Sequence, residues 1–473
     1  MKVALTLAPH DQLATAGFKT GGRKVYGYSM PLGVAYLSAV LEKAGHNVAL
    51  LDPNPRGMNS AKIAEWLVAQ RPDVVGISSM THMAPAAYEV AQYAKRNMPG
   101  VPIVMGGSHC TVWPERVLPE CAHIDVVAIG EGESRIAQIV ESCRDEQALA
   151  KIPGLIFRAK NGEGVRTGDP VIQKDLDAIP FPARHLFDHA LYLSWPDQVR
   201  KQPTTNVITS RGCSWHRCKF CFEGGRYMPP YRRRSPENVA AEFVEIKRKG
   251  FNGVSIWDDN FCVGRAWVAK LCALLREANL GVTWTCYARA DTLTEEMVKD
   301  IGSVGCFSVY FGFESGDQGT LDLIDKGTTL DQMRKGVRLC HKYGVEVRGS
   351  FILGMPSDTP AIARQTIAFA KELDLDSVKF MLYTPEPGTP LHDMALQHGK
   401  VVREGFLGSL TKATYVPEGY ASIEQLETLA RDANRGYLLR PQFILKKLRS
   451  IRSWQDFRRY LDGFFMVVRL GRA

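Results

Sequence analysis

The feature that most constrains the fold is an alternation of short apolar runs with longer amphipathic segments, which occurs twice along the 473 residues. Such alternation is typical of parallel sheets whose strands are joined by helices. For residues 1–148 it predicts a doubly wound parallel sheet. The predicted strands are Val3–Leu7, Val48–Leu51, Val74–Ser78, Ile103–Met105 and Val126–Ala128, and the predicted helices are Pro31–Ala44, Ala61–Gln70, Ala84–Asn97 and Ser134–Cys143.

The second alternation predicts an α/β barrel over residues 203–390. Residues 149–202, which are rich in proline and have little periodicity, predict a connector with one hairpin. Six strand–helix units of this size favour a partial (β/α)6 barrel, whose site lies where the strands end. The predicted strands are Asn206–Thr209, Gly253–Trp257, Thr283–Tyr287, Ser308–Phe311, Val347–Phe351 and Ser377–Phe380, and the clearest helices are Pro236–Lys249, Trp267–Glu277 and Leu330–Tyr343.

Residues 391–473 predict a basic helical region, with helices at Ile423–Leu439 and Pro441–Leu448 and an apolar run at Leu461–Leu470. From residue 431 onward there are eleven basic and three acidic residues, so this tail carries +8 of the net charge of +9. The nearly neutral remainder does not indicate a nucleic-acid-binding surface. We expect the tail to pack across the barrel; the second interpretation is an amphipathic surface that contacts anionic lipid.

The cysteines and the hydropathy of the chain indicate the cellular compartment in which the protein works. The eleven cysteines are scattered without a paired framework, which indicates a reducing cytoplasm. No stretch approaches the roughly 20 apolar residues that span a bilayer. We therefore expect a cytoplasmic protein, with the lipid contact of the tail as the peripheral alternative.

Three cysteines, Cys213, Cys218 and Cys221, fall within nine residues directly after the first strand of the predicted barrel. Thiolates are soft ligands suited to iron–sulfur clusters and zinc. Three protein ligands on a four-iron cluster would leave one iron open for chemistry. The alternative is a zinc site with His216 as fourth ligand, although so tight a loop would strain the tetrahedron.

Polar and glycine-rich residues follow the predicted strands in both halves. In the barrel, Asp258, Asp259 and Asn260 follow the second strand, Arg289 and Asp291 the third, and Gly312–Gly316 the fourth. An isolated acid such as Asp258 is also a common helix cap, which is the alternative interpretation. Three loops of the first half predict a ligand site at one edge of its sheet, where glycines allow close backbone approach. Their residues are Ser78, Ser79, Met80, Thr81, Gly106, Gly107, Ser108, His109, Gly130, Glu131 and Gly132. Because no G-x-G-x-x-G follows the first strand, a dinucleotide is not favoured.

These motifs resemble the radical S-adenosylmethionine (SAM) superfamily, in the subgroup with an N-terminal cobalamin-binding domain. The branch is the one containing the anaerobic magnesium-protoporphyrin ester cyclase and the cobalamin-dependent radical methylases. The resemblance covers nearly the whole chain. It is carried by the segments 31–37, 106–109, 130–133, 209–213, 231–237, 351–356 and 383–390.

The resemblance implies three cofactors: a [4Fe–4S] cluster, SAM and cobalamin. Cys213, Cys218 and Cys221 would bind the cluster, and the three glycine-rich loops would bind cobalamin. The SAM contacts implied for matching positions are Phe220, Asp258, Asp259, Arg289, Glu314, Ser315, Ile352 and Leu353. The catalytic residues are not specified by the motifs.

Two departures from the family pattern bear on these assignments. Four residues separate Cys213 from Cys218 where the superfamily usually has three. The lower-face histidine motif of many cobalamin domains is missing after the first strand, where His10 stands without the motif around it. A similar segment with Asn54 in place of the histidine follows the second strand instead, and we treat it as a coincidence. We therefore expect cobalamin to bind without a histidine on cobalt.

The first functional hypothesis is a C-methyltransferase that abstracts hydrogen from an unactivated carbon of a small molecule or peptide and transfers a methyl group to it. The resemblance implies an electron donor such as a flavodoxin or ferredoxin as partner, and the charge distribution implies no nucleic acid. Oxidative cyclisation or rearrangement without methyl transfer is the close alternative. Candidates for the substrate pocket are Tyr383, Glu386 and Tyr227.

Two further hypotheses stand lower. A tRNA methylthiotransferase would need a second cluster on three N-terminal cysteines, whereas Cys110, Cys121 and Cys143 lie on unrelated predicted elements. The non-enzymatic hypothesis is a zinc-stabilised binding protein.

Overall fold

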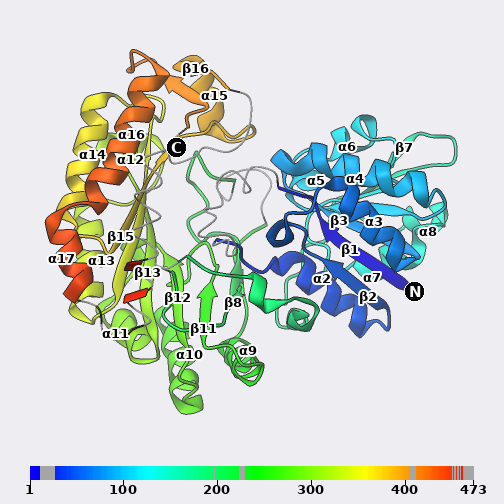
Figure 1. Ribbon diagram of the computed structural model, residues 1–473, viewed down its shortest axis with the longest axis horizontal. Helices are drawn as coiled ribbons and strands as arrows, with labels where there is room; N and C mark the ends of the chain where they lie inside the picture. Colours follow the sequence, from blue (N-terminus) through cyan, green and yellow to red (C-terminus); the bar gives the residue numbers. More distant parts are fainter. Residues whose placement is uncertain are drawn as a thin grey trace. The chain divides into compact units, whose positions relative to one another are not determined.

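The computed structural model describes residues 1–10, 27–195, 198–222, 229–403 and 412–449, with 451, 454, 457, 458, 460 and 461 beyond them. It divides into two compact units, Met1–Ser194 and Trp195–Ala473 (Figure 1). The predictions for Tyr227 and for positions 462–470 lie outside the described residues.

The first unit contains a seven-stranded sheet in the order β2-β1-β3-β4-β5-β6-β7. The first five strands are parallel, as predicted, and the order changes direction between β1 and β3. The last two strands form a hairpin that joins the sheet antiparallel through β5. The strands are β1 Lys2–Leu7, β2 Asn47–Leu51, β3 Val74–Ser78, β4 Ile103–Gly106, β5 Val126–Ala128, β6 Leu155–Arg158 and β7 Gly164–Arg166.

Helices cover both faces of this sheet. One core packs strand residues against α3, α4 and α6, and a second packs the opposite face against α2, α7 and α8. Successive residues of β1 alternate between the two cores, as the pleat of a strand requires. The helices are α2 Leu32–Lys43, α3 Ser60–Gln70, α4 Ala84–Asn97, α5 Ser108–Val112, α6 Pro114–Glu120, α7 Ile136–Ser142 and α8 Glu146–Leu149, with 3-10 turns η1 Asn54–Arg56, η2 Thr81–Met83, η3 Arg184–Leu186 and η4 His189–Leu191.

The second unit contains six parallel strands in the order β15-β14-β13-β12-β11-β8, the partial barrel that the alternation predicted. β8 and β15 are its two edges, so the sheet is open. A two-stranded pair, β9 with β10, follows the first strand. The strands are β8 Thr204–Val207, β9 Ser210–Arg211, β10 Arg232–Arg233, β11 Gly253–Ile256, β12 Thr283–Ala288, β13 Cys306–Glu314, β14 Glu346–Leu353 and β15 Ser377–Leu382.

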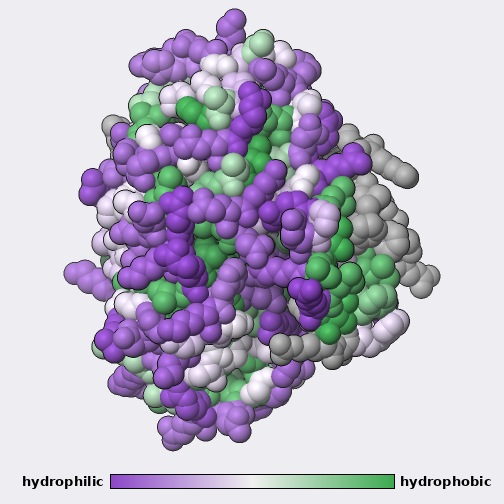
Figure 2. All heavy atoms as spheres, turned by 90° about the vertical axis from the view of Figure 1, so that its left-hand side faces the viewer, coloured by the Kyte–Doolittle hydropathy of each residue, from purple (hydrophilic) through white to green (hydrophobic). Residues whose placement is uncertain are grey.

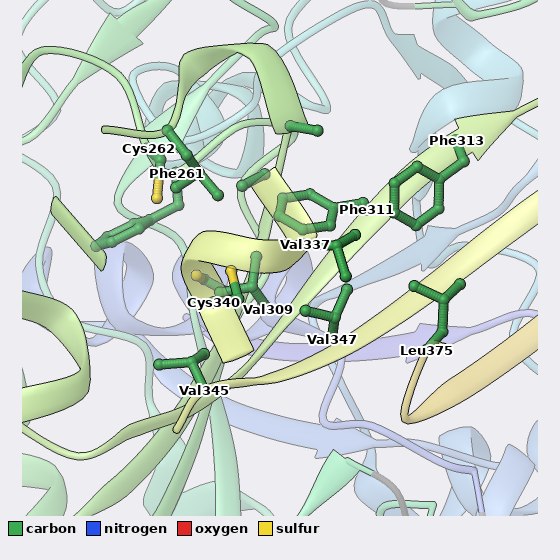
Figure 3. Close-up of a cluster of buried hydrophobic side chains, with 14 of the residues drawn as sticks. Phe261, Cys262, Val309, Phe311, Phe313, Val337, Cys340, Val345, Val347 and Leu375 are labelled. Carbon is green, nitrogen blue, oxygen red and sulfur yellow. The ribbon is translucent and has the colours of Figure 1, made fainter. Parts of the chain in front are cut away.

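The outer face of this sheet is the main core of the unit. Alternate strand residues such as Val309, Phe311 and Val347 pack against the helices, together with Cys262 and Cys340 (Figure 3). The covering helices are α9 Pro236–Arg248, α10 Arg265–Ala278, α11 Glu295–Ser303, α12 Gln318–Leu323, α13 Leu330–Lys342 and α14 Pro360–Glu372, with the 3-10 turn η7 Ala290–Thr292. The inner face carries the other half of each strand, which is mostly polar.

The last part of the chain is helical with one small hairpin, as expected. It contains α15 Pro390–Gln397, β16 Gly399–Val401, β17 Tyr415–Pro417, α16 Ile423–Leu438 and α17 Pro441–Arg449. α16 packs on the outer core through Leu426, Ala430 and Tyr437. The side of the unit on which α16 and α17 lie is largely hydrophilic (Figure 2). Among the described residues, no helix has the length and apolar character needed to cross a membrane.

Candidate functional site

The three cysteines lie on the loop that follows β9, at the carboxyl end of the barrel sheet. Cys218 is buried, while Cys213 and Cys221 are partly exposed. The amide of Cys221 donates to the carbonyl of Cys218 over 3.2 Å, which forms a tight turn between these two ligands. The loop therefore presents one protected thiol and two accessible ones.

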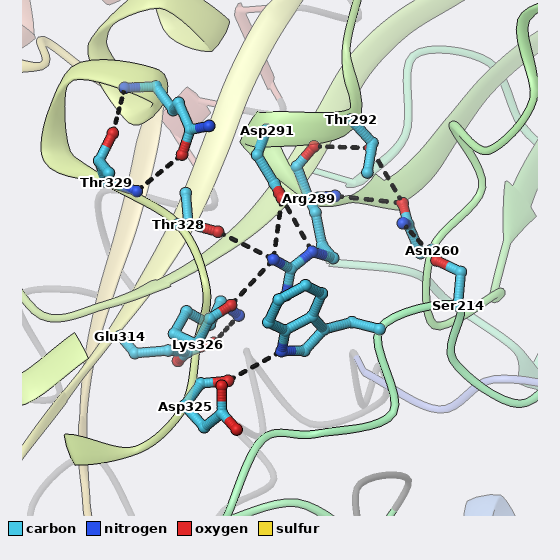
Figure 4. A network of polar contacts seen from close by, with 12 residues as sticks. Ser214, Asn260, Arg289, Asp291, Thr292, Glu314, Asp325, Lys326, Thr328 and Thr329 are labelled. Carbon is cyan, nitrogen blue, oxygen red and sulfur yellow. Dashed lines mark hydrogen bonds and ion pairs between the residues drawn. The ribbon is translucent and has the colours of Figure 1, made fainter. Parts of the chain in front are cut away.

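The loop is fixed by contacts to the segment between α12 and α13. The indole nitrogen of Trp215 donates to the carbonyl of Asp325 over 2.8 Å (Figure 4). Its ring lies so close to Gly327 that a Cβ there would come within 2.0 Å of it. On the far side of the turn, the amide of Lys219 donates to the carbonyl of Ile324 over 2.9 Å. The additional residue of the first cysteine gap is thus accommodated by Trp215, which turns inward, and by His216, which adopts φ 53°.

Asp258 positions the start of this loop. Its buried carboxylate accepts hydrogen bonds from the amide of Thr209 (2.6 Å) and the hydroxyl of Ser210 (2.8 Å), and from the Thr209 hydroxyl. Burial raises the pKa of Asp258, although these hydrogen bonds act in the opposite direction. Since the carboxylate already has three donors, its observed role is to fix the β8–β9 turn, which makes it a poorer candidate for contacting SAM than its neighbour.

Asp259 and Asn260 differ from Asp258 in what they contact. Asp259 is exposed at the strand end, yet partial desolvation and the adjacent Asp258 raise its pKa to about 6. Asn260 is buried and joins Ser214 of the cysteine loop to the amide of Arg289. Asp259 is therefore the acid of this segment that is accessible to a ligand.

Arg289 is almost fully engaged within the protein. Its guanidinium donates twice to Asp291, at 3.1 and 2.9 Å, and to the carbonyl of Lys326 and the hydroxyl of Thr328 (Figure 4). The same group stacks over the Trp215 ring at 4.6 Å. These contacts indicate that Arg289 supports the cysteine loop rather than presenting a free fork to a carboxylate.

Glu314 forms a buried ion pair with Lys326, with 2.8 Å between Oε1 and Nζ. Glu314 adopts φ 64° at the end of β13, where the register with β14 also shifts. Burial opposes the charge of Lys326, but the nearby carboxylate outweighs it and raises the lysine pKa. Burial also raises the pKa of the Cys218 thiol, and the Lys326 ammonium partly offsets that effect. A cation thus lies beside the most buried of the three thiols.

The remaining SAM candidates divide between two faces. Ile352 and Phe220 pack beside Tyr383 on the inner side, and Lys326 lies 6.0 Å from the centre of the Phe220 ring. Leu353 belongs to the outer core instead. Ser315 is buried, with its hydroxyl 3.2 Å from that of Thr366. The structure brings Phe220, Ile352 and Glu314 to the cysteine loop, whereas Leu353 and Ser315 face the helices.

Two of the pocket candidates lie beside this cluster. The hydroxyl of Tyr383 is buried without a hydrogen-bond partner among the described residues, and its ring contacts that of Tyr415 at 5.7 Å. Burial raises the pKa of Glu386, a few residues after β15, to about 7.

The donor set suits an iron–sulfur cluster. Within the described part of the chain, no three His, Cys, Asp or Glu side chains converge closely enough for a single metal ion. The residue types fit an iron–sulfur cluster, because thiolates are the usual ligands of such clusters.

The predicted ligand loops of the first unit also meet at one edge. The amide of Ser79 donates to the carbonyl of Gly106, and that of His109 to the carbonyl of Ser79. Gly107 has φ 97°, and a Cβ there would lie 2.5 Å from the Ser79 carbonyl oxygen, so glycine is required. The third loop is connected to these through a 3.0 Å bond from the amide of Gly130 to Thr111.

Residues at this edge differ in accessibility. Met80 and Ser108 are exposed, and Ser78, Thr81, Glu131 and Gly132 are partly exposed. His109 is buried against α4, with its Nε2 atom 3.0 Å from the Tyr88 hydroxyl, so it does not lie on the exposed edge. Arg135 donates to the carbonyls of Ile129 and Glu131 and so fixes the backbone of the third loop.

Sequence reasoning missed two groups. Lys326 follows α12 and gave no signal, since an isolated lysine is usually solvated. In the first unit, His82 lies next to His10, with 3.2 Å between their Nε2 atoms, after β3 and β1. Desolvation and the neighbouring His10 lower the pKa of His82 to about 4. This pair lies where the strand order reverses, the position where doubly wound sheets bind ligands.

Comparison with known proteins agrees with both units. Residues 19–140 match the B12 binding domain, and residues 207–370 match the radical SAM superfamily. An uncharacterized methyltransferase from Pyrococcus horikoshii is 31% identical over 449 residues, which is 95% of each chain. The chain belongs to the cobalamin-binding radical SAM enzymes. As in that family, its two units are a B12-binding domain followed by a radical SAM domain, as the sequence motifs implied.

Other members of the family are more distant. The anaerobic magnesium-protoporphyrin IX monomethyl ester cyclase of Rubrivivax gelatinosus is 28% identical over 382 residues, 79% of this chain and 68% of the cyclase. A radical SAM methyltransferase from Kitasatospora setae, solved with tryptophan and a SAM analogue, has a TM-score of 0.65 at 20% identity, covering 90% of this radical SAM enzyme and 82% of that chain. The last likeness establishes the fold.

Proposed function

We propose that this chain is a cobalamin-dependent radical SAM C-methyltransferase. When bound, the reduced [4Fe–4S] cluster with SAM supplies a carbon-centred radical, and methylcobalamin supplies the methyl group. The observation that carries the proposal is the arrangement around Cys218, where the Cys213 thiol, Lys326 and Glu314 lie near it at the carboxyl end of the sheet. The similarity to a methyltransferase over 95% of the chain supports methyl transfer as the outcome.

In this proposal Cys213, Cys218 and Cys221 bind the cluster. Lys326 is the cation best placed for the carboxylate of SAM, because its charge acts more strongly on the Cys218 thiol than that of Arg289. Asp259 and Glu314 are the acids placed for its amino group and ribose. Phe220 and Ile352 form an apolar wall for the adenine.

Cobalamin occupies the edge of the first unit in this proposal. The loops at Ser78–Thr81, Gly106–Ser108 and Gly130–Gly132, which are exposed or partly exposed except at Ser79, contact the cofactor. The two imidazoles of His10 and His82 contact each other, so we retain the prediction of cobalt without a histidine ligand. EPR spectra of the reconstituted cob(II)alamin form test this, since nitrogen hyperfine splitting from an imidazole would contradict it.

The function is tested with anaerobically purified and reconstituted protein. We expect iron and sulfide close to four each per chain, cobalamin retained after desalting, and reductive cleavage of SAM to 5′-deoxyadenosine. Zinc without sulfide would instead support a structural metal site and would reject the proposal.

Oxidative cyclisation or rearrangement is the second candidate, favoured by the 28% identity to the protoporphyrin ester cyclase. It uses the same cofactors, so cofactor analysis does not separate the two. Candidate substrates incubated with SAM labelled in its methyl group do so: label in the product supports methyl transfer, and an unlabelled product supports the cyclase reaction.

Partners follow from the chemistry. An enzyme of this family requires an electron donor and an organic substrate; we propose a flavodoxin or ferredoxin as donor.

A peripheral contact of α17 with anionic lipid is supported by the exposed Ile444, Leu445 and Leu448 beside Lys446 and Lys447. Pelleting with phosphatidylserine vesicles at low and high salt tests that contact, and binding that does not depend on salt or lipid charge would contradict it.

A further inference from the structure

The two faces of the barrel sheet differ in packing. The outer face is a closed apolar core, whereas the inner face carries Ser255, Thr285 and Ser308 on three neighbouring strands. Above this layer, the side chains of Trp257 and Met381 remain 45% and 38% exposed, although both are large and apolar. The inner face therefore has a buried polar layer with accessible apolar side chains above it, and it is not a second apolar core.

Arg348 lies on this inner face. It is the third residue of β14 and is only 2% exposed. Its Nε donates to the hydroxyl of Ser308 over 3.0 Å, and its guanidinium lies 5.4 Å from the centre of the Tyr310 ring. Its Nη1 is buried and has no hydrogen-bond partner among the described residues.

No carboxylate in the described chain neutralises Arg348. Glu346, two residues earlier on the same face, is paired with Arg200 at 2.7 Å. Glu314, higher on the next strand, is paired with Lys326. Lys379 on β15 lies in register with Ser350 on β14 and adds a second positive charge to the same face. A buried guanidinium with an unsatisfied donor is costly unless an anion completes it.

We propose that Arg348 binds an oxyanion of the substrate, a carboxylate or phosphate group, within the barrel. This inference rests on the proposed function and specifies its substrate class. A guanidinium presents paired donors that match such oxygens. Trp257, Met381 and the Tyr287–Tyr310 pair, whose ring centres are 5.0 Å apart, offer an apolar surface to the rest of the molecule. The substrate is therefore an organic acid or phosphate with an apolar or aromatic body.

The position of Arg348 separates this oxyanion from the carboxylate of SAM. Ile352 lies four residues after Arg348 in β14, which corresponds to about 13 Å along a strand. Ile352 lies with Phe220 beside the cysteine loop, where SAM is proposed to bind. A carboxylate held there by Lys326 is distant from the Arg348 backbone.

The test compares the reconstituted wild-type enzyme with R348M, using inorganic phosphate as the probe. At constant ionic strength we expect phosphate to raise the thermal unfolding midpoint of the wild type, with an apparent Kd at least about tenfold weaker in R348M. Without phosphate, R348M should be as stable as the wild type or more stable, because it removes an uncompensated buried charge. A purely structural arginine predicts the reverse: a large loss of stability and an unchanged phosphate response, and this result would overturn the proposal.

Controls separate this proposal from the proposed function. R276M removes an exposed arginine paired with Asp300 and should respond to phosphate like the wild type. R348M should retain the cluster, the change that SAM causes in its EPR spectrum, and cleavage of SAM to 5′-deoxyadenosine. Loss of the SAM effects in R348M alone would assign the oxyanion to SAM and reject the substrate assignment. Absence of SAM cleavage in the wild type would reject the proposed function and leave the phosphate result to be judged separately.

S308A provides a second variant if R348M does not fold. It removes only the hydroxyl that orients Nε, so it should weaken the phosphate response while retaining the cluster. An unchanged phosphate response in S308A would count against the proposal.

Discussion

The two candidate binding regions are built in opposite ways. The edge of the first unit is formed mainly by backbone and small side chains, with several residues exposed and few side-chain bonds. The carboxyl end of the barrel sheet instead contains buried charged groups, each with a partner: Asp258 with Thr209, Arg289 with Asp291, and Lys326 with Glu314. The first suits a large cofactor that brings its own reactive centre. The second suits a small charged cofactor whose orientation the protein must impose.

The largest expected effect separates the two regions outright. C218S removes the buried thiol of the cysteine loop, so we expect iron, sulfide and SAM cleavage to fall to background while cobalamin binding persists. C272A, which changes a buried cysteine of α10 outside the loop, should keep its iron. Loss of cobalamin from C218S would show that the two sites are not independent.

Breaking the Lys326–Glu314 pair is the next largest effect. K326M leaves the Glu314 carboxylate buried without a partner, so the free energy of unfolding should fall by about 3–5 kcal/mol. The double variant K326M/E314Q, which removes both charges, should recover much of that loss. Urea denaturation under anaerobic conditions measures both, and a K326M cost below about 1 kcal/mol would show that the pair is solvated.

Gly327 tests how the long cysteine loop is supported. G327A adds a Cβ 2.0 Å from the Trp215 ring at φ 65°, so we expect displacement of Trp215 and a severalfold loss of reconstituted iron. Gly344 has a similar φ of 70° but open space around it. G344A therefore pays the conformational cost alone, about 1–3 kcal/mol, and should reconstitute normally. Equal iron in both variants would contradict the support role.

Gly107 gives the corresponding test in the first unit. G107A should prevent the loops after β3 and β4 from meeting, because the new Cβ would lie 2.5 Å from the Ser79 oxygen. We expect weaker cobalamin binding with the cluster retained. The matched control is G162A, at φ 88° in the β6–β7 turn with nothing within 4 Å. Equilibrium dialysis with hydroxocobalamin should distinguish the two variants.

The smallest expected effect is a pH dependence from Glu386. Its pKa of about 7 exceeds the ordinary value of 4.5, so the folded protein binds this proton more tightly than the unfolded chain. Stability from this group is then fully present below pH 4.5 and is lost as pH rises toward 7. In E386Q, the urea concentration at the unfolding midpoint should depend less on pH between pH 4.5 and 7.5 than in the wild type. An equal slope in both proteins would show that Glu386 titrates normally.

Much of the architecture follows from hydrophobic periodicity. The strand and helix ranges of both sheets agree with the structure to within a few residues, because every strand is buried on at least one face. The addition of β6 and β7 to the first sheet was not specified. Leu155–Arg158 is an apolar run like any other, and its antiparallel direction depends on pairing with β5. The division of the chain at Ser194 likewise depends on tertiary contacts.

The site was predictable where chemistry depends on residue type and spacing, as for the three cysteines. It was less so where a role depends on what a side chain contacts. Asp258 and Asp259 are adjacent and chemically identical, yet one fixes a turn and the other is exposed. The sequence predicts that Arg289 pairs with the carboxylate of SAM, whereas in the structure Arg289 pairs with the carboxylate of Asp291. Lys326 and Arg348 become notable only through burial, which no local pattern encodes.

The bonds from Thr209 and Ser210 to Asp258 bear on how the metal centre is assembled. These bonds join protein groups only, so we expect the backbone leading to Cys213 to keep its shape when the cluster is absent. Insertion of iron and sulfide should then require little refolding of the chain, and a protein that has lost its cluster should be able to bind a new one.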